Sequence, residues 1–360
     1  MSARQLVLEA AAAVGFDTIR FARVESTPHI SAFDAWIAAG KHGDMHYLAR
    51  GRDVRANPRE RLASARTAVV LALPHHHRRP PDPGGRTGLV ARYAWGRDYH
   101  NIIDKRLKKL KRALRASGMN VWGGVDTAPI LERSWAGAAG LGFSGKNSMQ
   151  ILVGTSSWFF LAVVFINVDI PPDPPVGDHC GDCIRCLSIC PTDAFDGPRD
   201  LDSTKCISYW SIEARGLPPR HLRPAFGRWF FGCDLCQEVC PHNHDPPIPD
   251  CDDLLPRNAW IDLDEILATP DDVLLERFIG TPLRRPKGHG LKRNAAIVLG
   301  NLGDDGGVDS LREHGLTHPE PVVRGASVWA LQRLGAPPDL TDPDPLVAAE
   351  LRAGRRAGDL

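Results

Sequence analysis

The sequence predicts an α+β protein built from three structured parts, and three observations support this fold class. Residues 1–170 alternate between helical and strand-like patterns of apolar side chains. Eight of the nine cysteines lie between Cys180 and Cys240. Two segments near the C-terminus are similar to each other at a spacing of 32 residues. A chain of 360 residues is long enough for two or three domains of roughly 100–200 residues each.

The composition is that of a soluble globular protein, with 43% hydrophobic and 24% charged residues. The formal net charge is +1, so overall charge does not make the chain a polyanion-binding protein. Its most apolar run, Trp158–Ile166, covers nine residues, whereas a membrane-spanning helix needs about 20. The N-terminus carries no recognisable export signal. We therefore expect a cytoplasmic protein with no membrane partner, whose cysteines are metal ligands rather than disulfides.

The first part, residues 1–170, is predicted to be a mixed α/β domain in which helices flank a sheet. Residues Thr67–Pro74, Gly88–Ala94 and Met119–Asp126 have strand-like apolar patterns bounded by proline or glycine. Between the last two segments, an apolar stripe recurs every three or four residues, which is helical spacing. The stripe consists of Ile103, Leu107, Leu110 and Leu114. This segment is therefore expected to be a helix with one buried face.

The second part, residues 171–250, follows a proline-rich boundary at Ile170–Asp178 and contains two cysteine runs. The first run places Cys180, Cys183, Cys186 and Cys190 at the spacing of bacterial ferredoxins, and a proline follows the last cysteine. In that arrangement three thiolates bind one [4Fe–4S] cluster, and the fourth ligates the other cluster. We therefore predict a ferredoxin-like domain with two [4Fe–4S] clusters.

The second run contains three cysteines, and Cys240 again precedes a proline. By the same logic Cys240 completes cluster one, whose ligands are then Cys180, Cys183, Cys186 and Cys240. Cluster two lacks one ligand, which Cys206 supplies, so its ligands are Cys190, Cys206, Cys233 and Cys236. Cys251 is predicted not to be a ligand. Two zinc sites are the alternative, but the four-cysteine run with its proline is much more specific than two C-x2-C pairs.

The third part, residues 251–340, is predicted to be an α-helical repeat module, followed by a tail at residues 341–360. Lys292–Gly303 and Arg324–Gly335 align with matching small and apolar positions. Self-similarity at this period is typical of stacked helical pairs. The segments are similar to short HEAT-like repeats, and two repeats are few for an independent solenoid.

Several segments of the chain resemble the epoxyqueuosine reductase family. They are "RYAWGRDYH" (Arg92–His100), "VDTAPILER" (Val125–Arg133), "GLGFSGKNSM" (Gly140–Met149) and "CISYWSIE" (Cys206–Glu213), and the resemblance runs from Arg4 to about Gly335. It implies a cobalamin-dependent enzyme that reduces epoxyqueuosine to queuosine at the wobble position of tRNA. Electrons would pass from an unidentified donor through the two clusters to cobalamin, and the N-terminal domain would bind that cofactor.

The resemblance also implies a proton donor, Asp126, which follows a predicted strand and precedes a predicted helix. An acid at this point could protonate the departing epoxide oxygen. The alternative is that Asp126 caps a helix starting near Pro129, since aspartate is a favoured N-cap residue. The cobalamin-binding residues that the resemblance implies are Arg55, Ala91, Asp126, Lys146, Gln150, Leu161 and Ser208.

Two basic segments are candidates for contact with tRNA. Lys105–Arg115 places seven positive charges on the predicted amphipathic helix, a pattern that also fits a simple solvated face. Arg284–Arg293 is a basic, glycine-containing segment that enters the repeat module and suits phosphates better. Its predicted tRNA-binding residues are Arg284, Arg285, Lys287, Lys292 and Arg293.

Two other functions are compatible with the cysteine pattern. One is a corrinoid reductive dehalogenase, which would not need a basic helical C-terminus. The other is a non-catalytic iron–sulfur electron carrier, which would not need a large N-terminal domain. A macromolecular substrate needs open access, so we expect a monomer.

Overall fold

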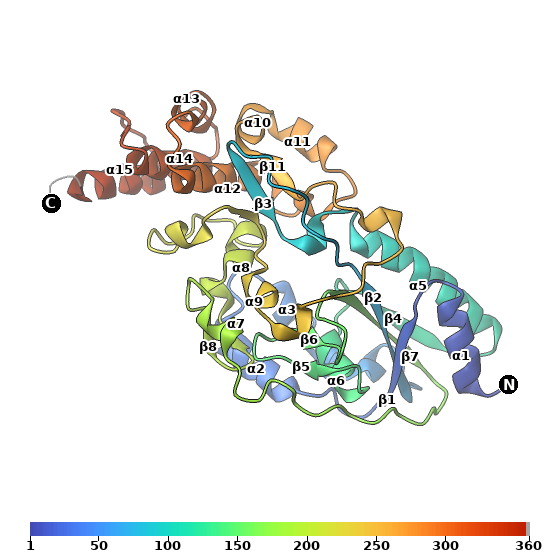
Figure 1. Ribbon diagram of the computed structural model, residues 1–360. Helices are drawn as coiled ribbons and strands as arrows, with labels where there is room; N and C mark the ends of the chain where they lie inside the picture. The colour runs from blue at the N-terminus through green and yellow to red at the C-terminus, as the bar shows by residue number, and fades with distance from the viewer. Residues whose placement is uncertain (358–360) are drawn as a thin grey trace. The chain divides into compact units, whose positions relative to one another are not determined.

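The computed structural model describes residues 1–357, which form two compact units (Figure 1). Unit 1 comprises Met1–His77, Arg97–Asp202 and Leu235–Leu255. Unit 2 comprises Arg78–Gly96, Ser203–Asp234 and the chain from Pro256 onward. The chain crosses between the units five times, so the units do not coincide with the four predicted ranges. The predicted combination of a mixed α/β part, a cysteine-rich part and a helical part is present.

Unit 1 is built on a four-stranded sheet in the order β1-β2-β7-β4, with every neighbouring pair antiparallel. The strands are β1 (Thr18–Arg23), β2 (Thr67–Pro74), β4 (Val121–Gly124) and β7 (Phe159–Ile166). β2 and β7 are central and almost entirely buried, which explains why their sequences are continuously apolar. The most apolar run of the chain is thus β7. None of the helices in residues 1–357 is long and apolar enough to cross a membrane.

Helices cover this sheet. α6 (Glu132–Ala138) packs on the sheet through Trp135, which is buried with Val70 and Phe165 in one apolar cluster. α5 (Tyr99–Ala116) packs against β4 and against α1 (Ala3–Ala12). The predicted buried stripe of α5 is confirmed, since Ile103, Leu107, Leu110 and Leu114 are inaccessible to solvent. Three shorter helices lie between β1 and β2: α2 (Ile30–Ala38), α3 (Tyr47–Arg50) and α4 (Arg52–Ala56).

The cysteine-rich part of unit 1 contains only short elements. A hairpin of β5 (Phe143–Ser144) and β6 (Gln150–Ile151) precedes it, and a second hairpin consists of β8 (Phe195–Gly197) and β9 (Asp200–Leu201). One helical turn follows the start of each cysteine run: α7 (Arg185–Ser188) and α9 (Leu235–Glu238). These two turns pack against each other.

Unit 2 contains a three-stranded sheet in the order β10-β3-β11. β3 (Thr87–Val90) pairs parallel with β10 (Trp229–Phe231) and antiparallel with β11 (Trp260–Asp262). The strand predicted at residues 88–94 is therefore shorter than expected, because Arg92–Ala94 form a 3₁₀ turn. The helices of this unit are α8 (Ile207–Ile212), α10 (Leu263–Ala268), α11 (Asp271–Arg277), α12 (Lys287–Leu302), α13 (Gly307–Ser310), α14 (Pro321–Arg333) and α15 (Pro345–Ala357).

The internal repeat corresponds to two helices that pack against each other, α12 and α14. A side chain at Gly300 of α12 would collide with the backbone of Ala330, so glycine permits this close approach. Equivalent positions of the repeat carry a cation paired with an aspartate. Lys292 lies 3.6 Å from Asp271, and Arg324 lies 2.6 Å from Asp342.

The segment predicted as a tail is part of the helical module. Val347 and Leu351 of α15 are buried in a cluster with Val328 of α14. Glu350 of the same helix accepts two hydrogen bonds from the buried guanidinium of Arg223, at 2.6 and 2.9 Å. The boundary predicted at residue 340 is therefore wrong, because α15 supplies apolar side chains and a buried ion pair to the module.

Candidate active site and cysteine clusters

Asp126 lies in the short connection between β4 and α6, in a backbone conformation that L-residues rarely adopt (φ 36°). Its backbone N–H donates a 2.8 Å hydrogen bond to Oε1 of Glu132, the first residue of α6. The N-cap of α6 is Leu131. Asp126 is therefore not the cap of this helix, and its side chain, 56% exposed, is available for other contacts.

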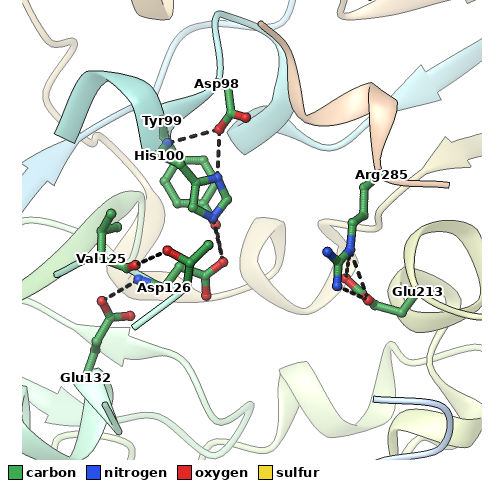
Figure 2. A network of polar contacts seen from close by, with 9 residues as sticks. Asp98, Tyr99, His100, Val125, Asp126, Glu132, Glu213 and Arg285 are labelled. Atoms are coloured by element: carbon green, nitrogen blue, oxygen red, sulfur yellow. Dashed lines mark hydrogen bonds and ion pairs between the residues drawn. The ribbon is translucent and has the colours of Figure 1, made fainter. Parts of the chain in front are cut away.

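The carboxylate of Asp126 accepts two hydrogen bonds from the start of α5 (Figure 2). The hydroxyl of Tyr99 lies 2.9 Å from Oδ2, and Nε2 of His100 lies 2.8 Å from the same oxygen. The other ring nitrogen of His100 lies 2.7 Å from Oδ1 of Asp98, which also caps α5. An imidazole between two carboxylates satisfies both only when it is protonated, because both of its nitrogens must then donate.

The protonation states of this network follow from burial and charge. Burial lowers the pKa of His100, but the hydrogen bonds to Asp126 and Asp98 outweigh it and raise the pKa to about 9. Burial raises the pKa of Glu132 to about 8, and the negative charge of Asp126 adds to this. At neutral pH His100 is therefore charged, and Glu132 mostly holds its proton. Two residues that hydrogen-bond to Asp126, His100 and Glu132, therefore carry protons at neutral pH.

Stacked rings hold Tyr99 and His100 in place. The ring of Tyr99 lies 4.0 Å from the ring of His100 and 4.2 Å from that of Phe160 on β7. Phe160 in turn stacks on His75, 4.3 Å away, just after β2. Sequence reasoning assigned no role to Tyr99, His100 or Glu132. The available signal was an aspartate N-cap followed directly by Tyr-His at the start of an amphipathic helix.

The first cysteine run and the end of the second line one cavity of about 170 Å³. Its cysteines are Cys180, Cys183, Cys186 and Cys240, the four residues predicted to bind cluster one. Lys146 lines the same cavity, and its Nζ donates a 2.6 Å hydrogen bond to the carbonyl of Gly181. This contact places Lys146 beside the cysteine loop.

The four cysteines predicted for cluster two are distributed between the units. Cys190 and Cys236 belong to unit 1, and Cys206 and Cys233 belong to unit 2. Cys190 Sγ accepts a hydrogen bond from the backbone N–H of Ala194 at 3.4 Å, a contact of the kind that tunes iron–sulfur clusters. All nine cysteines are free thiols. Cys251 accepts a 3.7 Å hydrogen bond from Arg106.

The backbone around Cys233 is fixed by two contacts within unit 2. The buried carboxylate of Asp234 accepts a 2.8 Å hydrogen bond from the backbone N–H of Arg92. Gly232, at φ 69°, lies against Ala91, so a side chain at residue 232 would collide with the Ala91 methyl group. Ala91, a predicted cofactor residue, is thus buried beside the second cysteine run. Sequence reasoning missed Asp234, a buried carboxylate between two cysteines that are predicted to be ligands.

The other predicted cofactor residues have different environments. Arg55 is buried; its Nη1 donates to the carbonyl of Leu48 at 3.2 Å, and burial lowers its pKa. Gln150 is buried and donates to the carbonyl of Leu141 at 2.6 Å. Leu161 packs beside the apolar core of the sheet. Ser208 lies on α8 in unit 2, directly after the segment that carries Cys206.

The predicted tRNA-binding residues divide into exposed and buried ones. Arg284, Arg285 and Lys287 are exposed, and Arg285 forms a 2.8 Å ion pair with Glu213 (Figure 2). Lys292 is buried and donates to the carbonyl of Leu267.

Arg293 is completely buried, and its guanidinium donates to the carbonyls of Trp210, Ala214 and Gly216. The expectation that Lys292 and Arg293 contact tRNA is therefore wrong, because both cations are used inside the protein.

The site and the cysteine runs define an iron–sulfur oxidoreductase. Residues 179–243 match the family described as "4Fe-4S double cluster binding domain", and residues 55–127 match "Epoxyqueuosine reductase QueG, DUF1730". The chain is 36% identical over 344 residues to the epoxyqueuosine reductase of Pseudomonas aeruginosa, covering 89% of this chain and 92% of the relative. It is 38% identical over 310 residues to that of Gloeobacter violaceus, with coverages of 82% and 95%.

Solved structures show the same relationship. An epoxyqueuosine reductase crystallised with an epoxyqueuosine-modified stem loop of tRNA-Tyr superposes with a TM-score of 0.91 at 27% identity, covering 99% of both chains. The enzyme from Streptococcus thermophilus superposes with a TM-score of 0.88 at 26% identity over 100% of both chains. The chain belongs to the epoxyqueuosine reductase family, as its sequence motifs predicted.

Proposed function

We propose that this protein reduces epoxyqueuosine in tRNA to queuosine, with Asp126 as the proton donor. The observation that carries the proposal is the Asp126 site, in a chain related over nearly its whole length to enzymes of this name. The structural neighbour crystallised with an epoxyqueuosine-modified stem loop supports tRNA as the substrate. Removal of an epoxide oxygen requires a proton source, and the carboxylate of Asp126 is hydrogen-bonded to Tyr99 and to the protonated His100.

The reaction converts an epoxide to an alkene and water, and it consumes two electrons and two protons. Both carbon–oxygen bonds break, and the oxygen leaves as water after it receives both protons. The first proton passes from Nε2 of His100, 2.8 Å away, to the carboxylate of Asp126, and Asp126, whose side chain is the exposed member of the network, passes it to the epoxide oxygen. Solvent reprotonates His100, and the same route then delivers the second proton. Tyr99 and Glu132 keep the carboxylate oriented.

The electrons enter through the iron–sulfur domain. We assign Cys180, Cys183, Cys186 and Cys240 to cluster one, which is supported by the cavity that these residues share. Cys190, Cys206, Cys233 and Cys236 are assigned to cluster two on their spacing. A [4Fe–4S] cluster passes single electrons, so an external donor must supply two electrons in turn. The free thiols of these residues are consistent with a reducing, cytoplasmic compartment.

The family implies cobalamin as the further cofactor, and residues of unit 1 fit it. Arg55 is a buried guanidinium that favours additional acceptors, such as amide oxygens. The hydroxyl of Ser148 is buried without a hydrogen-bond partner among the described residues, in the loop between Lys146 and Gln150. When bound, the corrinoid would supply the low-valent reducing power needed to cleave a carbon–oxygen bond. Lys146 and Gln150, which bond to backbone carbonyls, hold this loop in place.

In unit 2, Arg284 and Lys287 are exposed cations at the start of α12, the first helix of the HEAT-like pair. We assign them to tRNA phosphates. Arg285 contributes less, because it is already paired with Glu213.

An anaerobic assay tests the function. Protein loaded with iron, sulfide and cobalamin is mixed with chemical reductant and tRNA that contains epoxyqueuosine, and the nucleosides are then analysed. We expect stoichiometric conversion to queuosine. Absence of conversion by fully loaded protein would contradict the proposal, and dehalogenation of a chlorinated substrate by the same sample would favour the dehalogenase alternative. Anaerobically purified protein that contains no bound corrinoid would favour the alternative function as a non-catalytic electron carrier.

A further inference from the structure

One face of α5 carries a row of four exposed cations, Lys105, Lys108, Lys109 and Arg112, which we call the α5 stripe. Their spacing of three and four residues places them on one side of the helix, opposite the buried leucines. None of the four forms a hydrogen bond or ion pair with any residue in the described part of the chain. The nearest acidic residue on the helix is Asp104, at the flank of the stripe.

This arrangement is unfavourable for the isolated protein. Like charges three or four residues apart on a helix destabilise it by about 0.2–0.5 kcal/mol per pair, and each member of the stripe has at least two such neighbours. The chain as a whole is nearly neutral, with 44 basic and 43 acidic residues. The concentration of positive charge is therefore local, and a polyanion would relieve the repulsion.

The stripe is fixed relative to the candidate active site, because α5 begins at the residues that bond Asp126. At 1.5 Å per residue, its cations lie about 9 to 20 Å along the helix from Tyr99. A nucleotide reacting at Asp126 remains attached to its RNA strand and stem. A duplex carries one charge per roughly 1.7 Å of axis, so several phosphates fall within this range.

We propose that the α5 stripe binds the phosphate backbone of the substrate RNA outside the reacting nucleotide. This proposal rests on the proposed function and adds a contact surface in unit 1 to the one in unit 2. An acidic protein, such as an electron donor, is the competing occupant. RNA is favoured because the stripe starts at the site where the RNA must react.

The test is the salt dependence of binding of full-length epoxyqueuosine tRNA. The variant Lys105→Gln/Lys109→Gln/Arg112→Gln removes three cations, keeps good helix formers and removes repulsion, so its Tm should equal or exceed that of the wild type. The control variant is Arg23→Gln/Arg61→Gln/Arg66→Gln, which removes three exposed cations of the same unit. Arg23 and Arg66 lie at the other end of the sheet, about 20 Å from Asp126.

We expect the plot of log Kd against log salt to become less steep by about 2 for the stripe variant and to stay unchanged for the control. The KM for tRNA should rise about tenfold at moderate salt while kcat is retained. Equal slopes for wild type and stripe variant would overturn the proposal. A stripe variant that binds tRNA normally but loses turnover only when a protein supplies the electrons would also overturn the proposal. That result would make the α5 stripe a docking surface for the electron donor. If the slopes differ but the wild type reduces no epoxyqueuosine, the proposed function fails and RNA binding stands.

Discussion

The Nε2 atom of His100 lies 2.8 Å from Oδ2 of Asp126, while its Nδ1 atom lies 2.7 Å from Oδ1 of Asp98. One imidazole thus connects the helix cap of α5 to the candidate proton donor. Because both partners are carboxylates, the ring is held in its charged form, and it presents a transferable proton to Asp126. The chemistry proposed for Asp126 therefore depends on a residue 26 positions earlier in the chain.

Replacing His100 by glutamine should change how stability depends on pH. The pKa of His100 is about 9 in the folded protein, above the ordinary value of 6.5. The stabilisation from its two carboxylates is therefore complete below pH 6.5 and lost as the pH rises through 9. The difference in unfolding free energy between wild type and His100→Gln should shrink by at most about 3 kcal/mol between pH 6 and pH 10. Denaturant titrations at several pH values measure it, and a constant difference would show that His100 is not held charged.

Glu132 should act through the backbone of Asp126. Glu132→Ala removes the acceptor of the Asp126 N–H, so the strained connection loosens and turnover should fall about tenfold. Glu132→Gln keeps the acceptor and serves as the matched control.

The stability of the glutamine variant should also depend less on pH between about 4.5 and 8. With a folded pKa of about 8 against 4.5, wild-type Glu132 makes stability fall as the pH rises from 4.5 through 8. Equal turnover by Glu132→Ala and wild type would show that Glu132 does not position Asp126 for the reaction.

The sequence predicted those features that depend on local pattern. The apolar stripe of α5 and the strand β2 were predicted because burial of one face, or of a whole central strand, leaves a periodic signal. The pairing of β3 with β10 and β11 was not predictable, because these partners lie about 140 and 170 residues away in the chain. Similarly, Asp126 was identified by resemblance, but its contacts with Tyr99 and His100 exist only in the folded chain.

Charge was the least reliable signal. Arg293 was grouped with exposed basic neighbours, yet the helix directs it inward to three carbonyls. The composition of a segment gives the number of its charged residues, but it does not show which of them the folded helix places in the interior and which at the surface. In α15, prolines and aspartates before the helix concealed the apolar positions Val347 and Leu351.

The cysteine assignments predict unequal effects on iron content. Cys206→Ser should lose about half of the iron, because cluster two loses a ligand while the cavity of cluster one is untouched. Cys251→Ser is the matched control and should retain the iron content of the wild type. Within the described residues, the thiol of Cys251 has one hydrogen-bond partner, Arg106. Iron and sulfide analysis of anaerobic protein decides this. The reverse pattern would make Cys251 the eighth ligand.

The exposed cations of unit 2 should contribute to tRNA affinity and not to cofactor content. Arg284→Gln/Lys287→Gln should weaken tRNA binding and reduce the salt slope by about 1 to 2. Arg285 is left unchanged because its removal would also take away the ion-pair partner of Glu213. The double variant Arg312→Gln/Arg352→Gln, which changes one exposed cation just after α13 and one on α15, should bind normally. Identical slopes for both variants would move the RNA contact away from the start of α12.

The most direct test of the account is single-turnover reduction of epoxyqueuosine tRNA by Asp126→Asn. Asparagine preserves the size of the side chain and can still accept from Tyr99, so bound iron, bound cobalamin and tRNA affinity should match the wild type. It cannot deliver a proton, and general acid catalysis typically contributes about 10²–10⁴-fold, so the rate should fall by that factor. A loss in this range, in fully loaded protein, is the result that the account predicts. A variant that retains more than about a third of the wild-type rate would contradict it and place the proton donor elsewhere.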